Sequence, residues 1–156
     1  MQFRHARDYF NRGLLHFQKG EEREALADYG DAIVLDPKLF AAYLNRANIL
    51  IEQGDDNRAI ADLTQALALN SRDGGLLVSR GSLYAHKGNY QSAIADFSKA
   101  IEFEPNNAVA WRDRGIAHGS MGDDVKAASD AAEAIRLDPD MSNAASTMRR
   151  KQSTQL

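Results

Sequence analysis

A glycine recurs every 34 residues along this chain, and this spacing constrains the fold more than any other sequence feature. The recurring glycines are Gly20, Gly54, Gly88 and Gly122. Small residues follow each glycine at the same interval, first at Ala25, Ala59, Ala93 and Ala127, and then at Ala32, Ala66, Ala100 and Ala134. A fixed period of this length is typical of a solenoid built from stacked helical units. Residues 6–141 therefore divide into four repeats with no insertion between them.

The stretch from Arg80 to Pro105 shows what one repeat contains. A helical pattern ends at Gly88, and glycine is favoured there because it accepts the left-handed conformation that terminates many helices. A second helical pattern ends before Pro105, since the residue that precedes a proline is pushed out of the helical region. Each repeat is therefore predicted to be a hairpin of two helices. Because one hairpin cannot cover its own apolar face, the hairpins are expected to stack.

The pattern resembles the tetratricopeptide repeat (TPR), whose signature positions are aromatic, Leu, Gly, Tyr, Ala, Phe, Ala and Pro. The third repeat matches at Gly81, Tyr84, Gly88, Ala93, Phe97, Ala100 and Pro105, and Trp111 supplies the signature tryptophan in the fourth. The resemblance implies an all-α fold, a right-handed α-solenoid of helix-turn-helix hairpins (a TPR superhelix), in a single domain over residues 1–156. We expect the repeats at 6–39, 40–73, 74–107 and 108–141, and a C-terminal capping helix at about 142–151.

One departure from the signature occurs in every repeat, because arginine replaces the leucine. The arginines are Arg12, Arg46, Arg80 and Arg114, and an aspartate recurs with them at Asp28, Asp62, Asp96 and Asp130. We predict that each arginine pairs with the aspartate of its own repeat and ties the two helices together, since a planar guanidinium fits a carboxylate. The alternatives are that both positions are solvated, or that the shared spacing only records duplication of the repeat.

The fourth repeat matches the pattern least well. Gly119 falls inside its first helix, where glycine costs up to ~1 kcal/mol relative to alanine. Its second helix is rich in alanine, with Ala128, Ala131 and Ala132. We therefore expect looser packing in this repeat.

Composition and charge argue against several classes of protein. The 156 residues are 44% hydrophobic and 26% charged, which is typical of a globular protein. A net charge of −3 gives a nucleic-acid partner little electrostatic support outside Arg149, Arg150 and Lys151. The chain has no cysteine, which excludes disulfides and thiol chemistry. No apolar run suggests a membrane span or a secretory signal, so the expected location is cytoplasmic.

No catalytic motif stands out. The four histidines lack metal-ligand spacing, and we see no phosphate-binding glycine loop and no nucleophile motif. The acidic pairs Asp55-Asp56 and Asp123-Asp124 are explained as N-terminal helix caps. We therefore predict no enzyme activity, no metal and no cofactor.

In the family that the repeat resembles, ligands bind a concave face lined by the first helix of each repeat, which implies a peptide-binding groove here. The candidate groove residues are Phe10, Asn11, Leu14, Phe17, Leu44, Asn45, Asn48, Ile51, Val78, Ser79, Ser82 and Arg112. The asparagine amides could hold an extended peptide because they donate and accept hydrogen bonds at once. The alternative is that the stripe formed by Phe10, Leu14 and Phe17 is core, or is covered by the N-terminal residues.

A subset of the family captures acidic chaperone tails with a clamp of lysine, asparagine, asparagine, lysine and arginine. The corresponding positions here are Phe10, Leu14, Asn45, Gly75 and Ser79. Only Asn45 agrees, so this clamp is not expected. The resemblance predicts a non-catalytic protein–protein interaction module, or adaptor, for a protein or peptide ligand. Two alternatives remain: a self-assembling scaffold whose solenoid ends stack into a homo-oligomer, and a regulatory part of a larger enzyme or signalling protein.

Overall fold

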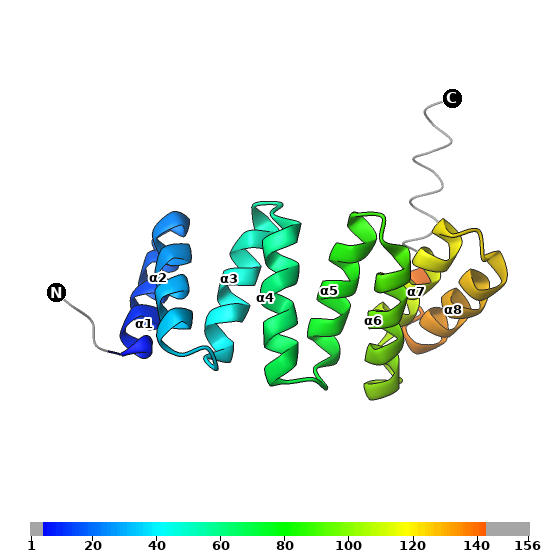
Figure 1. Ribbon diagram of the computed structural model, residues 1–156. Helices are drawn as coiled ribbons and strands as arrows, with labels where there is room; N and C mark the ends of the chain where they lie inside the picture. The colour runs from blue at the N-terminus through cyan, green and yellow to red at the C-terminus, as the bar shows by residue number, and fades with distance from the viewer. Residues whose placement is uncertain (1–4, 143–156) are drawn as a thin grey trace, which may run out of the picture. The chain divides into compact units, whose positions relative to one another are not determined.

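The computed structural model describes residues 5–142, and within them the chain forms eight α-helices (Figure 1). The helices are α1 (Ala6–Gln18), α2 (Glu22–Leu35), α3 (Phe40–Glu52), α4 (Asp56–Leu69), α5 (Gly74–His86), α6 (Tyr90–Phe103), α7 (Ala108–Ser120) and α8 (Asp124–Leu137). Each odd-numbered helix packs against the helix that follows it. The predicted all-α fold of helical hairpins is therefore confirmed. The predicted capping helix lies outside the described residues, except for Ser142.

The four recurring glycines adopt the left-handed conformation that the sequence predicts. Their φ angles are +76° at Gly20, +73° at Gly54, +76° at Gly88 and +81° at Gly122. The residue after each glycine donates its backbone N–H to a carbonyl in the last turn of the first helix; from Glu21 to His16 the distance is 2.9 Å. This bond terminates the first helix, and the second helix begins at the next residue.

The second helices of the last three hairpins begin with a side-chain cap. Asp55, Asn89 and Asp123 each accept a hydrogen bond from the backbone N–H three residues later, at 3.2 Å in every case. The interpretation of Asp55 and Asp123 as helix caps is therefore confirmed. In α2, Glu21 occupies the same place without a side-chain cap. Acidic residues in the first turn of α2 still favour the helix through its dipole.

In the first and third hairpins, an aromatic ring of the second helix packs onto a glycine of the first helix. A Cβ built at Gly81 of α5 would lie 2.7 Å from Cε1 of Phe97 on α6, and one at Gly13 of α1 would lie 2.7 Å from Cε1 of Tyr29 on α2. Those distances are far inside van der Waals contact. The ring therefore occupies the space that any larger residue would need, and this explains why glycine precedes the turn.

Every hairpin contains the predicted arginine–aspartate pair. The pairs are Arg12–Asp28, Arg46–Asp62, Arg80–Asp96 and Arg114–Asp130. In each, the arginine donates from Nε and Nη2 to the two oxygens of one carboxylate, and the Nε distances are 2.7–2.8 Å. The aspartates are only 3–5% exposed. Because both oxygens have a charged donor, the buried carboxylates are compensated.

Two of the arginines, Arg46 and Arg114, also lie close to the hairpin that precedes them in the same unit. Nη1 of Arg114 donates to Oγ of Ser98 on α6 at 3.1 Å, and Nη1 of Arg46 would lie 3.5 Å from a Cβ added at Gly30 on α2. The hydrogen bond to Asp62 raises the pKa of Arg46 above its ordinary value, although burial acts in the opposite direction. The guanidinium therefore stays charged where it holds α3 and α4 together.

The packing divides the chain after Arg72 into two compact units, with α1 to α4 in unit 1 and α5 to α8 in unit 2. In unit 1, Tyr29 of α2 and Ile49 of α3 belong to one core cluster. In unit 2, Phe97 of α6 and Ala117 of α7 belong to the corresponding cluster. Each cluster joins the two hairpins of its own unit.

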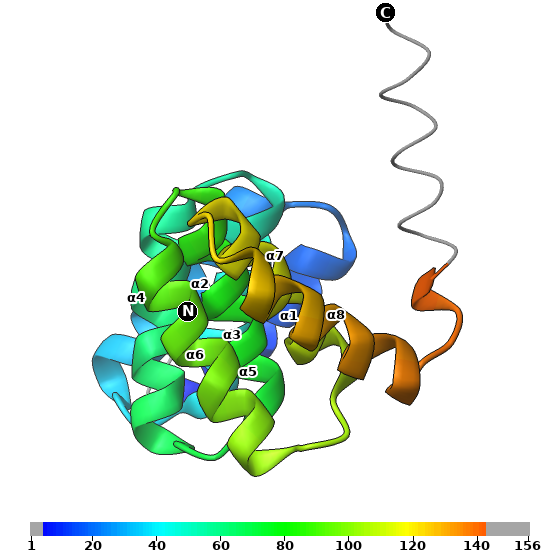
Figure 2. The ribbon, with the colours of Figure 1, turned by 90° about the vertical axis from the view of Figure 1, so that its right-hand side faces the viewer.

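The second helix of the fourth hairpin buries fewer residues than those of the middle hairpins. α8 buries two residues, Asp130 and Ala134, whereas α4 and α6 bury five each. Although α7 and α8 lie side by side (Figure 2), Val125 of α8 remains 82% exposed. Ala131 stands where the third hairpin has its aromatic ring, so Gly115 faces backbone and Cβ atoms of α8 instead of a ring.

Candidate functional site

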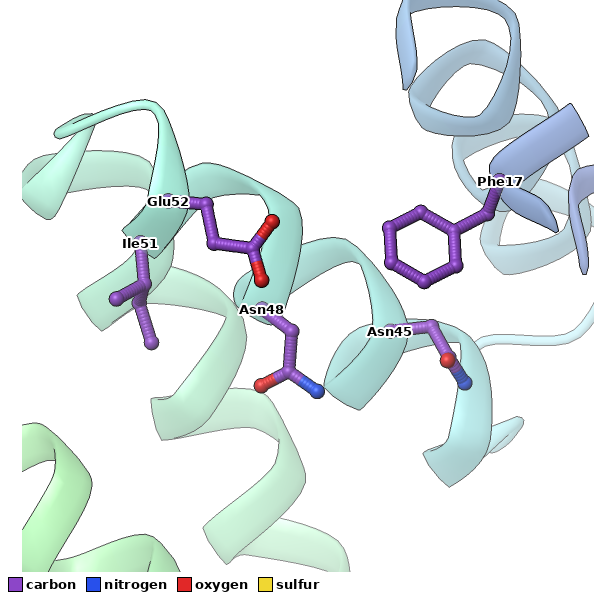
Figure 3. Close-up of a pocket in the computed structure, with 5 residues that line it drawn as sticks. All are labelled: Phe17, Asn45, Asn48, Ile51 and Glu52. Carbon is purple, nitrogen blue, oxygen red and sulfur yellow. The ribbon is translucent and has the colours of Figure 1, made fainter. Parts of the chain in front are cut away.

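A shallow pocket of about 230 Å³ lies between α1 and α3 in unit 1 (Figure 3). We call it the α1–α3 pocket, and its lining residues are Phe17, Asn45, Asn48, Ile51 and Glu52. Figure 3 shows the ring of Phe17 on α1 directed toward α3, with Asn48 and Glu52 on the side of α3 that faces it. The pocket thus combines one aromatic and one aliphatic wall with two amides and a carboxylate.

Four of these five lining residues are among the candidate groove residues; Glu52 is not. Its position four residues after Asn48 places it on the same face of α3. That spacing was the available signal.

The aromatic and aliphatic candidates on α1 differ in their surroundings. Phe10 and Leu14 are half-buried and pack against the core cluster that contains Tyr29, and the ring centroids of Phe10 and Tyr29 are 5.7 Å apart. Phe17, one turn further along the same stripe, is 39% exposed. The stripe is therefore core at its beginning and open at its C-terminal end, where the pocket lies.

The polar groups of the pocket differ in what they offer a ligand. Nδ2 of Asn45 donates one of its two N–H groups to the carbonyl oxygen of Ala41 at 2.8 Å, which leaves Oδ1 and the second N–H available. Asn48 and Glu52 are exposed, and neither side chain forms a hydrogen bond or an ion pair with another described residue. The pocket therefore presents unused acceptors of three side chains and N–H donors of two amides.

The remaining candidates do not line this pocket. Asn11 of α1 is exposed, and Leu44 of α3 is half-buried. In unit 2, Val78 of α5 packs against the core cluster of α6, and Oγ of Ser79 donates to the carbonyl oxygen of Gly75 at 3.0 Å.

Two further candidates lie in unit 2, and one of them is exposed to solvent while the other is paired with a charged neighbour. Ser82 of α5 is exposed. On α7, Nη2 of Arg112 lies 2.7 Å from Oδ1 of its neighbour Asp113. Half of the guanidinium is therefore engaged within α7 before any ligand arrives.

The histidines and carboxylates of the described part of the chain do not gather into a metal site. Among residues 5–142, no group of three or more His, Asp or Glu side chains is arranged to hold a metal ion. Nδ1 of His16 instead lies 2.6 Å from Oε2 of Glu21, a contact that ties the end of α1 to the start of α2. None of the helices described is both long and apolar enough to cross a membrane.

These features define a helical repeat protein: it has four helical hairpins, left-handed glycines at their turns and exposed side chains on its first helices. Comparison with family models gives the class its name. Residues 13–54 and 81–122 match the model described as TPR repeat, and residues 40–73 match the model described as Tetratricopeptide repeat. The chain belongs to the tetratricopeptide-repeat family.

Several solved structures share this fold. A crystal structure of MamA is 21% identical, with a TM-score of 0.78 over 88% of this chain and 81% of that chain. A tetratricopeptide repeat protein from Parabacteroides merdae is 20% identical, with a TM-score of 0.78 over 86% of this chain and 54% of that one. The C-terminal part of a TPR repeat-containing protein from Cytophaga hutchinsonii is also 20% identical, with a TM-score of 0.75 over 86% of this chain and 53% of that one. At these identities the likeness shows the fold alone. No curated protein sequence matches the chain.

Proposed function

We propose that this protein is a non-catalytic interaction module that holds a peptide segment of a partner protein in the α1–α3 pocket. The single observation that carries the proposal is the pocket itself, where the 39% exposed ring of Phe17 lies beside Asn48, whose side chain has no partner among the described residues. Repeats of this family suggest protein partners. The proposal adds the place of contact and the chemistry of that contact.

The size and lining of the pocket suit one side chain of a peptide better than a whole small molecule. Sites for drug-sized ligands have volumes of about 300–1,000 Å³, and this pocket has about 230 Å³. Phe17 and Ile51 would contact the apolar part of the bound side chain. Asn48 would bond to the adjacent peptide backbone, because a side-chain amide matches both the N–H and the C=O of an extended strand.

The lining also supports a binding role without catalysis. Glu52 is its single titratable residue, and no hydroxyl, imidazole or amine lines the pocket beside it. General acid–base or nucleophilic catalysis needs such a partner within hydrogen-bond reach. The pocket therefore has the groups to hold a ligand and lacks a pair of groups to transform one.

An affinity capture from the source cell, read by mass spectrometry, tests the proposal. The wild-type protein is compared with the double variant Phe17→Ala, Asn48→Ala and with Leu15→Ala. Leu15 makes a matched control because it lies on the same helix and is 56% exposed, yet does not line the pocket. We expect a partner that is lost only with the double variant, at unchanged helical content by circular dichroism. A partner retained by all three proteins would contradict the proposal.

Self-association is a second candidate function, and it is favoured by exposed apolar residues on α8. Val125 is 82% exposed and Ile135 is 39% exposed. Two such side chains on one helix offer an apolar contact for another copy of the chain. This function would use unit 2 and leave the α1–α3 pocket open, so the two candidates can be tested separately.

A further inference from the structure

We propose that the α1–α3 pocket takes a lysine or arginine side chain, and that the ligand is therefore a basic peptide segment. This inference rests on the proposed function, because it specifies the ligand of the same pocket. It goes beyond that function by assigning a charge to the ligand.

The charge of the lining is negative. Glu52 is its single ionisable group, and no lysine, arginine or histidine lines the pocket. The carboxylate of Glu52 is exposed and has no hydrogen-bond or salt-bridge partner among the described residues. Asn45 adds the acceptor Oδ1. A cation can bond to Glu52, whereas an acidic residue would be repelled by it.

Part of the pocket lies near the C-terminal ends of two helices. Glu52 is the last residue of α3, and Phe17 is the last but one of α1. The C-terminus of a helix carries a partial negative charge, equivalent to about half an elementary charge, and so favours a nearby cation. Two such ends and one carboxylate act in the same direction. The electrostatic preference therefore does not depend on Glu52 alone.

The walls suit a long side chain with an apolar stem. Phe17 and Ile51 supply aromatic and aliphatic surface, against which lysine and arginine can lay their methylene groups while the charged head stays at the polar end. The exposed ring of Phe17 can also attract the cation over its face. An isolated carboxylate on an open surface would lack this second contact, so the aromatic wall and Glu52 together define the site.

A selection of random displayed peptides tests the assignment directly. The wild-type protein is compared with Glu52→Lys and with Glu102→Lys. The second variant is a matched control, since Glu102 is an exposed glutamate of α6 and the change in net charge is the same. We expect lysine or arginine to be enriched at one peptide position by the wild type and by Glu102→Lys. With Glu52→Lys, aspartate or glutamate should replace that preference.

A selected peptide is then synthesised with a fluorescent label, in one form that retains the basic residue and in another with glutamine in its place. We expect the glutamine form to bind the wild type about fivefold more weakly, the upper range for one exposed ion pair. The difference should become smaller with Glu52→Gln, because only the two helix ends then favour the charged form; an unchanged difference would contradict the role assigned to Glu52.

The outcomes separate this inference from the proposed function. Peptides that lose binding with Phe17→Ala but carry no basic preference would overturn the inference and leave the proposed function standing. If the Phe17→Ala variant binds the selected peptides as tightly as the wild type does, both the inference and the proposed function are overturned. Failure to enrich any peptide would likewise count against both, because a preformed peptide pocket should select one.

Discussion

Each of the four aspartates that face the arginines is buried, and its charge is balanced by a two-point hydrogen bond. Taking a carboxylate out of water is costly, so the arginine mainly offsets a penalty that burial of the aspartate creates. A buried pair of this kind can contribute little net stability compared with apolar residues of the same size. Removal of one partner, in contrast, leaves an uncompensated charge in the hairpin. The two situations make different predictions.

Arg80→Ala is expected to lower the free energy of unfolding by about 3 kcal/mol, because it leaves Asp96 buried and unpaired. The double variant Arg80→Met, Asp96→Leu should recover most of this loss, since it removes both charges and keeps apolar volume. Urea unfolding followed by circular dichroism measures both. A loss below about 0.5 kcal/mol for the single variant would mean that the pair acts as a solvated surface pair.

Tyr29→Phe is expected to raise the free energy of unfolding by about 1 kcal/mol. The hydroxyl of Tyr29 is buried and has no hydrogen-bond partner among the described residues, and burial raises its pKa. The third hairpin already has phenylalanine at this position, with the ring of Phe97 against Gly81. The reverse change Phe97→Tyr should therefore be destabilising, and thermal unfolding of the two variants is compared. A stabilising Phe97→Tyr would contradict this reasoning.

At the scale of the helix and the hairpin, the residues that begin and end helices predict the structure well. Glycine at φ angles near +75° ends the first helices, and Asp55 and Asp123 begin the second ones. These features are local, so the sequence alone reveals them. The packing of Phe97 onto Gly81 is not local, because the two residues lie on different helices.

The two neighbouring glycines of the fourth repeat should respond to alanine in opposite ways. Gly119 lies inside α7, and a Cβ there would meet only Cβ of Ala127 at an ordinary 3.6 Å. Gly119→Ala is therefore expected to stabilise the protein by up to about 1 kcal/mol. Gly122 has a φ of +81°, so Gly122→Ala should destabilise it by about 1–2 kcal/mol. Melting temperatures that move in the same direction for both variants would refute the distinction.

At the scale of the whole molecule, the arrangement of one hairpin pair recurs in both units, but their surfaces differ. Unit 1 presents the α1–α3 pocket, whereas unit 2 has its candidate Arg112 paired with Asp113 and its last helix thinly packed. The repeat pattern predicted the hairpins. It could not predict where a pocket forms, because that depends on side-chain directions across two helices that lie far apart in sequence.

Self-association makes its own prediction for the whole molecule. If the apolar residues of α8 join two copies, light scattering should show a mass that rises with protein concentration. Val125→Glu should abolish the rise, because Val125 is 82% exposed in one copy and would become buried in the contact. A constant monomer mass at every concentration would remove this candidate function.

Site-specific photo-crosslinking in the source cell tests the proposed interaction surface most directly. A photoreactive phenylalanine analogue replaces Phe17 in one protein and Leu15 in another, so that both probes sit on α1 but only the first lines the α1–α3 pocket. A pocket that binds a partner predicts a defined crosslinked protein from position 17 and none of it from position 15. Equal crosslinking from the two positions, or none from position 17, would contradict the claim that this pocket holds the partner.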